Sequence, residues 1–564
     1  MPEKRAASEN FDGGAGIALF NALPELLAKV VPSGHRLMFS QASNFTRQMT
    51  QDNKLPIVIR ITARAGDNVL DSFTKLSAIF TVRIENGLRY TDMVPDSTES
   101  RDCGARTLFL ESIIRVEFAK LSLEEATRIV AVLPRCGFLS DLKLSDCGLG
   151  EEGVARLAAV LPQCPYLAGL DLGKNPIGTT GAESLAAVLR RCQFVSDLKL
   201  SACGLGDEGI ARLATVLPQC PCLAGLDLGI NDIGDQGARC LGVTLSQCSS
   251  LVDLILCQNH IGAAGAESIA VVLQKCPSLT RLILGCNFMG NQGVASLARV
   301  LPRGPSLIFL DLRANDIDDT GAGSLAAVLP ECPCLVCLDL SINDIGAEGA
   351  ENLSEALPQC SSLLLLNLHQ NKIGNTGAGS FAAVLPQCSL LASLDLSENG
   401  IGNAGAGSIA VVLAQCPSLA YLDLSKNSIG DDGAQSFAAV LPQWLSFSCL
   451  NFDDNDIGIA AVQRLAAVLV QCTFKALLKF DFDKIKHEEL KPLAVGLPQC
   501  QHLAYLDSSS NSLRFEGMDS WAAMLPQCKA LMNLNYLATG RSLEEVACMH
   551  ARNLHILDLF PGTT

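Results

Sequence analysis

The chain has 564 residues, of which 49% are hydrophobic but only 5% aromatic, so aliphatic side chains must build most of its interior. Its formal net charge is −16, and all of the net negative charge lies beyond residue 110. An acidic chain argues against binding of nucleic acid through its phosphates and fits either a basic protein partner or plain solubility.

The 24 cysteines have an unusual distribution, because thirteen of them fall in one column of a repeat described below. Small apolar thiols at such a position are predicted to be buried side chains rather than members of a disulfide framework. The N-terminal stretch MPEKRAASENFDGG has no apolar run behind its charges, and no uncharged apolar run is long enough to span a membrane. We therefore expect a reduced, cytoplasmic protein without a membrane segment.

The first part of the chain does not share the repeat. Residues 1–16 are predicted to be a flexible N-terminus, and residues 17–110 a small mixed α/β unit. Its predicted elements are a helix over 17–31, extended runs over 55–64 and 78–94, and a hairpin turn at Asn86–Gly87. The unit is interpreted as a cap for the exposed end of the array that follows, with a separate interaction module as the alternative.

From residue 111 onward the sequence repeats with a period of 28 residues. A degraded copy begins at Glu111, and Leu391–Ser418 is one of the regular copies. The copies after the first begin at Leu139, Leu167, Val195, Leu223, Leu251, Leu279, Leu307, Leu335, Leu363, Leu391, Leu419, Phe447, Lys475, Leu503 and Leu531. A fixed period of this length predicts stacked structural units in which each copy contacts its neighbours.

The first half of the copy at Leu391–Ser418 predicts a strand and a bend. Leu391, Leu394 and Leu396 alternate as in a short strand whose leucines face the interior. Asn399 follows, and most other copies have Asn, Cys or Asp in its column. Such a side chain is predicted to turn inward and bond backbone groups of the bend that would otherwise stay unpaired.

The second half of the copy predicts a short helix. Its apolar residues recur at helical spacing: Ala406, Ile409, Ala410 and Leu413. In most copies a proline such as Pro386 follows the last leucine and is expected to end the helix. A strand and a helix cannot bury their apolar sides alone, so the copies should stack into a right-handed α/β solenoid. The solenoid should have a parallel sheet inside the arc and helices outside.

The array changes near its C-terminal end. Regular repeats are assigned to residues 111–474, and residues 475–564 to degenerate repeats and a C-terminal cap. Trp444 replaces the column cysteine, and Lys479–Lys491 crowds charges where a loop and helix start belong. A binding patch around Lys479–Lys491 is the alternative to a simple cap.

The motif LxxLxLxxN/CxL and the second half IGxxGAxxLAxxL resemble leucine-rich repeats of the ribonuclease-inhibitor-like subfamily. Similar repeats occur in ribonuclease inhibitor, in the sensor regions of NOD-like receptors and in the GTPase-activating protein for Ran. The resemblance covers roughly residues 111–560. It implies a horseshoe whose concave sheet, sometimes with its rim loops, binds another protein. It does not by itself imply a ligand, because one fold hosts unrelated binding roles.

The sequence departs from each of these relatives. A NOD-like receptor needs a nucleotide-binding domain, but no GxxxxGK[ST] loop is present; Gly173-Lys174-Asn175 lacks both the spacing and the hydroxyl. The arginine of the Ran-activating proteins cannot be assigned to a residue here. Ribonuclease inhibitor alternates units of 28 and 29 residues, whereas this array keeps 28 throughout.

The column between the two inward leucines of each strand is predicted to be exposed on the concave face. It is rich in aspartate, and a ladder of like charges suggests a basic protein partner; the alternative is that repeat duplication copied Asp together with Leu. Neighbouring columns add aromatic and arginine side chains, which are frequent interface anchors. The predicted protein-binding residues are Arg281, Phe309, Asp311, Arg313, Asp339, Asp395, Tyr421 and Asp423.

No catalytic constellation stands out. The seven histidines are scattered, and Cys332-Pro-Cys334 with Cys337 is better explained by the repeat columns than by a metal site. We therefore predict no enzyme activity, no cofactor and no metal. The leading hypothesis is an intracellular protein-binding scaffold or receptor. The alternatives are a GTPase-activating protein for a Ran-like GTPase and a structural subunit of a cytoskeletal or flagellar complex.

Overall fold

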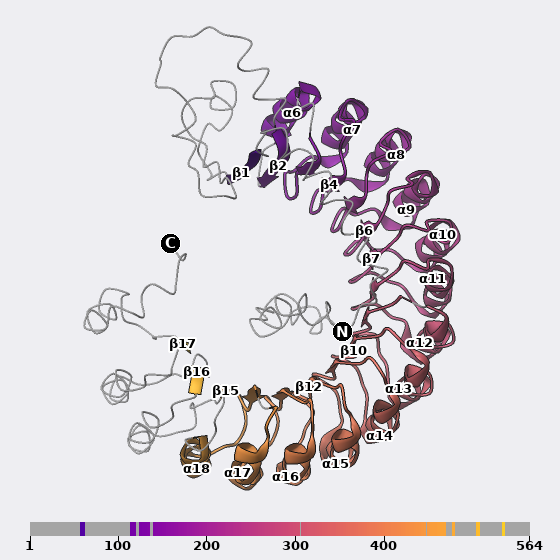
Figure 1. Ribbon diagram of the computed structural model, residues 1–564. Coiled ribbons are helices and arrows are strands. Elements are labelled where there is room, and N and C mark those ends of the chain that lie inside the picture. Colours follow the sequence, from indigo (N-terminus) through magenta and orange to yellow (C-terminus); the bar gives the residue numbers. More distant parts are fainter. Residues whose placement is uncertain are drawn as a thin grey trace, which may run out of the picture.

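The computed structural model describes residues 57–62, 113–119, 123–135, 139–469 except Pro305 and Phe447, 476–479, 503–507 and 533–535. The regular copies form an open arc in which the strands line the inside and the helices form the outside (Figure 1). This is the α/β solenoid of a leucine-rich repeat horseshoe that the repeat predicts. The arc arises because a helix is wider than a strand, so copies stacked side by side are spaced more widely on the helical side.

The described residues contain one sheet of 17 strands, and each strand pairs in parallel with the next one in the chain. The strands are β1 (Ile57–Thr62), β2 (Ile113–Ala119), β3 (Asp141–Lys143), β4 (Gly169–Asp171), β5 (Asp197–Lys199), β6 (Gly225–Asp227), β7 (Asp253–Ile255), β8 (Arg281–Ile283), β9 (Phe309–Asp311), β10 (Cys337–Asp339), β11 (Leu365–Asn367), β12 (Ser393–Asp395), β13 (Tyr421–Asp423), β14 (Cys449–Asn451), β15 (Ala476–Lys479), β16 (Leu503–Asp507) and β17 (Asn533–Asn535). From β3 to β14 the register places equivalent residues of successive copies side by side, so each column of the repeat becomes a row across the sheet.

Each described strand from β2 to β14 is followed by a helix on the outer face. The helices are α6 (Leu123–Val132), α7 (Gly150–Val160), α8 (Gly178–Leu189), α9 (Gly206–Ala214), α10 (Asp235–Leu245), α11 (Ala263–Lys275), α12 (Gly290–Ala298), α13 (Asp319–Ala326), α14 (Ala347–Ala356), α15 (Gly374–Val384), α16 (Asn403–Val412), α17 (Asp431–Val440) and α18 (Ile459–Leu469). None of the described helices is long and apolar enough to cross a membrane.

Many helices continue into one tight 3-10 turn. These turns are η3 (Leu133–Arg135), η4 (Leu161–Gln163), η5 (Leu217–Gln219), η6 (Leu301–Arg303), η7 (Leu329–Glu331), η8 (Leu357–Gln359), η9 (Leu385–Gln387), η10 (Leu413–Gln415) and η11 (Leu441–Gln443). Pro386 lies in η9, as its predicted role at a helix end requires. η10 has Ala414 at the equivalent position and adopts the same turn, so proline is compatible with this ending but is not needed for it.

The core is aliphatic and continuous, and the predicted columns fill it. Leu394, Leu396, Ile409 and Ala410 are fully buried, and their equivalents described in the other regular copies are buried too. The column cysteines Cys164, Cys192, Cys220, Cys248, Cys276, Cys332, Cys388 and Cys416 are buried free thiols at the helix ends, whereas Cys360 is only partly buried. Burial raises the pKa of these thiols, for example that of Cys276 to about 11. The cysteines therefore act as small core residues.

The asparagine column forms a ladder inside the bend, as predicted. Asn231 donates through Nδ2 to the carbonyls of Leu200 and Leu228, at 2.7 and 3.0 Å. Its Oδ1 accepts the backbone N–H groups of Cys203 and Leu205 in the preceding copy, at 3.0 and 3.3 Å. One side chain thus satisfies backbone groups of two copies that would otherwise be buried without partners.

The residue before each position of the asparagine column has a left-handed backbone. Its φ lies near +55° in every regular copy, although none of the residues is glycine. The residues are Asp146, Lys174, Ala202, Ile230, Gln258, Cys286, Ala314, Ile342, Gln370, Glu398, Lys426 and Asp454. The β-branched residues Ile230 and Ile342 are the most unfavourable members, because a side chain branched at Cβ clashes most in this conformation.

The ends of the array are described in part. β1 lies within the extended run predicted over residues 55–64, and it pairs in parallel with β2 at the start of the first degraded copy. The extended run predicted over 78–94 lies outside the described residues. The predicted helix over 17–31 and the turn at Asn86–Gly87 lie outside the described residues, as does most of Lys479–Lys491. Trp444 is fully buried, and its Nε1 donates to the carbonyl of Leu419 at 2.8 Å.

Candidate functional site

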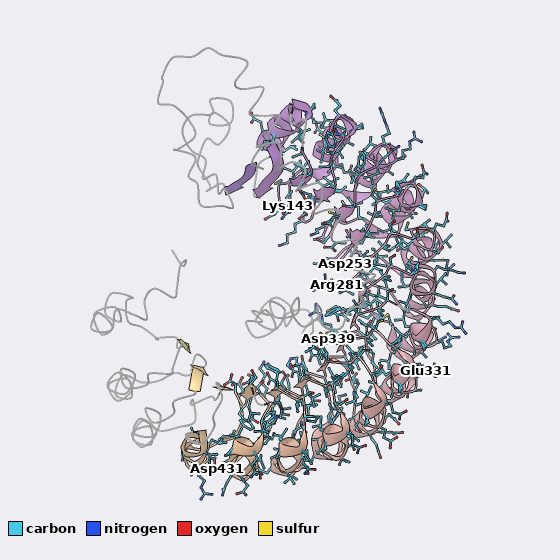
Figure 2. The ribbon with its side chains drawn as sticks, viewed as in Figure 1. Lys143, Asp253, Arg281, Glu331, Asp339 and Asp431 are labelled. Carbon is cyan, nitrogen blue, oxygen red and sulfur yellow. The ribbon has the colours of Figure 1, made fainter. Side chains whose placement is uncertain are left out.

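The concave face is formed by three rows of side chains. The first and third residues of each strand point away from the core, and so does the residue two positions after the strand. For β9 these are Phe309, Asp311 and Arg313, which alternate with the buried Leu310 and Leu312. We call the three sets the first, second and third rows. Figure 2 shows Asp253, Arg281 and Asp339 on the inner side of the arc, and Glu331 and Asp431 on the outer side.

The second row, which contains the predicted aspartates, bonds the protein's own backbone. In β12, Oδ1 of Asp395 accepts the backbone N–H of Ser397 at 2.9 Å and its hydroxyl at 2.5 Å. The same bond from the backbone two residues later is made to Asp171, Asp227, Asp311, Asp339, Asn367, Asp423 and Asn451, at 2.9 to 3.1 Å. The row therefore has a structural role, because these oxygens hold the start of each bend.

The prediction that the whole aspartate row is exposed is wrong. Asp311 and Asp423 are buried, with 3% and 6% of their surface accessible, and Asp339 and Asp395 are partly buried. The reason is that strands about 4.8 Å apart bring the side chains of adjacent copies into contact. Burial, followed by the neighbouring Asp339, raises the pKa of Asp311 to about 6, and burial with Asp423 raises the pKa of Asp395 to about 7.

Tyr421, a predicted anchor, is also engaged within the protein. It is partly buried, and its hydroxyl donates to Oδ2 of Asp423 at 2.9 Å. Nδ2 of Asn451 donates to the same oxygen at 2.8 Å. Neighbouring groups thus use most of the hydrogen-bonding capacity of Asp423. What Asp423 can present to a binding partner is its negative charge rather than a free acceptor.

The predicted residues Arg281, Phe309 and Arg313 lie together in the middle of the concave face. The guanidinium carbon of Arg281 lies 5.5 Å from the ring centroid of Phe309, a cation–π arrangement. Its Nη1 donates to Oδ2 of Asp253 at 3.2 Å. Nε of Arg313 lies 3.3 Å from Oδ2 of Asp311, and its side chain passes over Gly285, which has no Cβ to obstruct it. Asp253, Arg281 and Phe309 therefore form a chain of contacts across β7, β8 and β9.

Two isoleucines distinguish this region from the rest of the row. Ile255 and Ile283 occupy second-row positions in β7 and β8, where most copies have aspartate or asparagine. We call Asp253, Ile255, Arg281, Ile283, Phe309 and Arg313 the central patch. Sequence reasoning missed Asp253 and the two isoleucines as site residues, although apolar residues in an otherwise polar column were the available signal.

Two atoms of the central patch lack hydrogen-bond partners within the described residues. They are Oδ1 of Asp253 and Nε of Arg281, and both are buried although their side chains as a whole are about one third exposed. A buried polar atom left unpaired costs free energy, so native proteins seldom keep one without a reason.

Charge is unevenly distributed over the three rows. The aspartates are Asp141, Asp171, Asp197, Asp227, Asp253, Asp311, Asp339, Asp395, Asp423 and Asp453, and the cations are Lys143, Lys199, Arg281 and Arg313. Lys143 and Lys199 alternate with aspartates in the first copies. From β10 to β14 the three rows carry aspartates but no Lys or Arg. The concave face thus has a central patch with anchors and an acidic half that begins at Asp339.

A family model described as leucine-rich repeat matches ten segments of the chain. They are residues 163–186, 191–214, 219–242, 247–270, 275–298, 305–326, 331–354, 359–382, 387–410 and 415–438. Each segment begins near a helix end and covers the following strand and most of the next helix. Comparison with curated proteins finds no match.

Solved structures that the chain resembles include three repeat proteins at low identity. A plant peptide hormone receptor, RGFR1, in complex with RGF2 is 16% identical over 72% of this chain and 75% of that one, with a TM-score of 0.32. An internalin from Listeria monocytogenes is 16% identical over 77% and 89%, with a TM-score of 0.34. The yeast Rad7 and Elc1 complex gives 17% identity over 60% and 85%, with a TM-score of 0.39. By its repeats and its solenoid, this chain is a leucine-rich repeat protein.

Proposed function

We propose that the protein is a non-enzymatic scaffold that binds another protein on its concave face, through the central patch and the acidic half beside it. The observation that carries the proposal is the chain of contacts from Asp253 through Arg281 to Phe309, with buried atoms left unpaired. Arginine and aromatic side chains held in a fixed arrangement are typical interface anchors. The neighbouring Ile255 is partly exposed and adds apolar surface, whereas Ile283 is buried beneath the patch.

The partner is expected to present a basic segment. Asp339, Asp395 and Asp423 lie in successive or nearby copies of the acidic half, and the described concave rows there contain no Lys or Arg to neutralise them. Electrostatic complementarity of this kind raises the association rate and selects among partners. A cytoplasmic location and a likeness to the ribonuclease-inhibitor and NOD-like subfamily belong to the same proposal. The GTPase-activating and structural-subunit alternatives stay predictions.

The structure changes how this function should be tested. Replacing the aspartates by lysine would bury a cation and remove the acceptor for the backbone N–H, so the protein would be damaged whether or not it binds. Asparagine keeps the acceptor and removes the charge, as Asn367 and Asn451 do in the native chain. The double substitution D339N/D395N therefore isolates the charge, whereas Asp423 is kept because its Oδ2 also accepts from Tyr421 and Asn451.

The test uses immobilised 15-residue peptides with alternating Lys or Arg and aliphatic residues, and a matched set in which every cation is glutamate. The full chain should bind members of the basic set and none of the acidic set. The double asparagine variant D339N/D395N should bind them more weakly, with a smaller dependence on salt. R281A should weaken binding by about tenfold. Equal binding by all three proteins would contradict a concave site.

A further inference from the structure

A second group of unusual side chains lies on the loops that lead from the strands to the helices. His260 and Phe288 occupy equivalent positions in consecutive copies, and their rings stack with centroids 5.8 Å apart and planes 11° from parallel. The same position holds Asp232 in the copy before and Asp316 in the copy after. Nδ1 of His260 lies 3.5 Å from Oδ1 of Asp232. An aromatic pair is thus flanked along the array by carboxylates.

Ile230 lies two residues before Asp232 in the same copy and is hard to explain by folding. Its side chain is β-branched, its φ is +58°, and 48% of its surface is exposed. A strained backbone position would favour glycine or asparagine, and exposure means that the side chain gains little burial in return. The equivalent residue in the preceding copy is Ala202. The bend imposes this backbone on every regular copy, but it does not require a β-branched side chain, so the exposed isoleucine points to a role in binding.

Phe288 is exposed in the same way. Its accessible fraction is 57%, although the equivalent residues of other regular copies are mostly glycine or polar. Its stacking on His260 holds the ring in place, and its backbone N–H is fixed by the carbonyl of Ile261 at 2.9 Å. A rigid exposed aromatic ring is a favourable contact surface because little side-chain entropy is lost on binding. We call Ile230, Asp232, His260, Phe288 and Asp316 the rim patch.

The rim patch shares three copies with the central patch and extends one copy further, to Ile230 and Asp232. Asp253 and His260 lie on one copy, Arg281 and Phe288 on the next, and Phe309 and Asp316 on the third. The two residues of each pair are seven positions apart, and the chain between them leads from the start of the strand through the left-handed position into the loop. Two sets of residues, several of which depart from the repeat consensus, thus meet on three adjacent copies. On these copies the loop rim follows the concave face within seven positions of the chain.

We propose that the rim patch is a docking site for a basic segment of a protein partner, with an Arg or Lys side chain resting on Phe288 and an aliphatic side chain against Ile230. The aromatic face attracts a cation, and Asp232 and Asp316 supply negative charge on either side of it. The inference rests on the proposed protein-binding function and extends it from the concave sheet to the loops. The partner segment then crosses from the central patch onto the rim.

The test uses the basic and acidic peptide sets described above with the full-length chain. F288A should weaken binding of basic peptides by about tenfold, and D232N/D316N should weaken it and reduce its salt dependence. S428A changes the residue equivalent to Phe288 in another copy and should leave binding unchanged. If F288A and S428A bind alike, the rim patch is not the site.

Substitutions of the two isoleucines with a left-handed backbone separate an effect on peptide binding from an effect on stability. I230N and I342N replace residues with φ of +58° and +57° by the side chain that tolerates this backbone best, and each should raise the melting temperature. Only I230N should also weaken peptide binding, because Ile342 lies outside the rim patch. Unchanged affinity in I230N would overturn the proposal.

The two proposals can fail separately. Binding that is lost in R281A but kept in F288A and I230N overturns the rim patch and leaves the concave site standing. Binding that is lost in the rim variants but kept in R281A supports the rim patch and contradicts the concave site. No measurable binding of basic peptides by the native chain contradicts both.

Discussion

At the scale of single residues, each aspartate of the second row is both a hydrogen-bond acceptor for the bend and a negative charge on the concave face. The sequence alone does not separate these two roles. Oδ1 of Asp395 holds a backbone N–H, while burial and Asp423 raise its pKa to about 7. An acceptor is needed at this position, but a charge is not, as Asn367 and Asn451 demonstrate. The negative charge is thus an addition to the structural role and destabilises the fold when it forms.

The first prediction concerns D395N and its dependence on pH. The folded-state pKa of Asp395 lies above the unfolded value, so the native state binds more protons between about pH 4 and 7, and the free energy of unfolding falls as pH rises through that range. D395N removes this loss. The variant should be more stable than the native chain at pH 8, and the difference should shrink toward pH 4, as measured by denaturant unfolding.

D395A serves as the matched control. Alanine also removes the charge but leaves the backbone N–H of Ser397 without its acceptor, which typically costs about 1–3 kcal/mol. D395A should therefore be less stable than D395N at every pH. Equal stability of the two variants would mean that the hydrogen bond from Ser397 contributes nothing.

At the scale of one repeat, the bend between strand and helix depends on the asparagine ladder. Asn231 bonds backbone groups of its own copy and of the preceding one, so its removal leaves several buried groups unpaired. N231A should lower the free energy of unfolding by about 2–4 kcal/mol. Calorimetry or denaturant unfolding measures the difference.

The chain itself supplies the control for this prediction. Cys203 occupies the same column and bonds the carbonyl of Leu172 through its thiol at 3.3 Å. N231C should therefore lose less stability than N231A, because a thiol recovers part of the bonding. A loss in N231A below about 0.5 kcal/mol, within the range of ordinary surface changes, would show that the ladder is not essential.

The strands, bends and helices could be predicted from the periodicity of the sequence, because the positions of leucine, asparagine and alanine determine which side chains face the core. Ile409 and Asn399 lie where their columns place them. It could not assign the hydrogen bond from Ser397 to Asp395, since that bond depends on the path of the bend. It could not foresee the burial of Asp311 either, because the covering atoms belong to adjacent strands.

At the scale of the whole molecule, the array makes neighbours of residues that are 28 positions apart. A site can therefore be assembled from several copies without a motif in any one of them. Arg281 and Phe309 were recognised from the sequence as residue types suited to an interface. Their contact with each other, and the loop cluster of His260 and Phe288, emerged only from the register and the bends.

The central claim is that a partner binds the concave face and its rim on the copies that contain β7, β8 and β9. Hydrogen–deuterium exchange of the full chain, with and without a saturating basic peptide, tests it most directly. We expect slower exchange in these strands, in the bends that follow them, which include His260 and Phe288, and in the bend after β6, which includes Ile230. Exchange in the outer helices α11 and α12 should be unchanged. Protection confined to the outer helices, or to residues 1–110, would contradict the account.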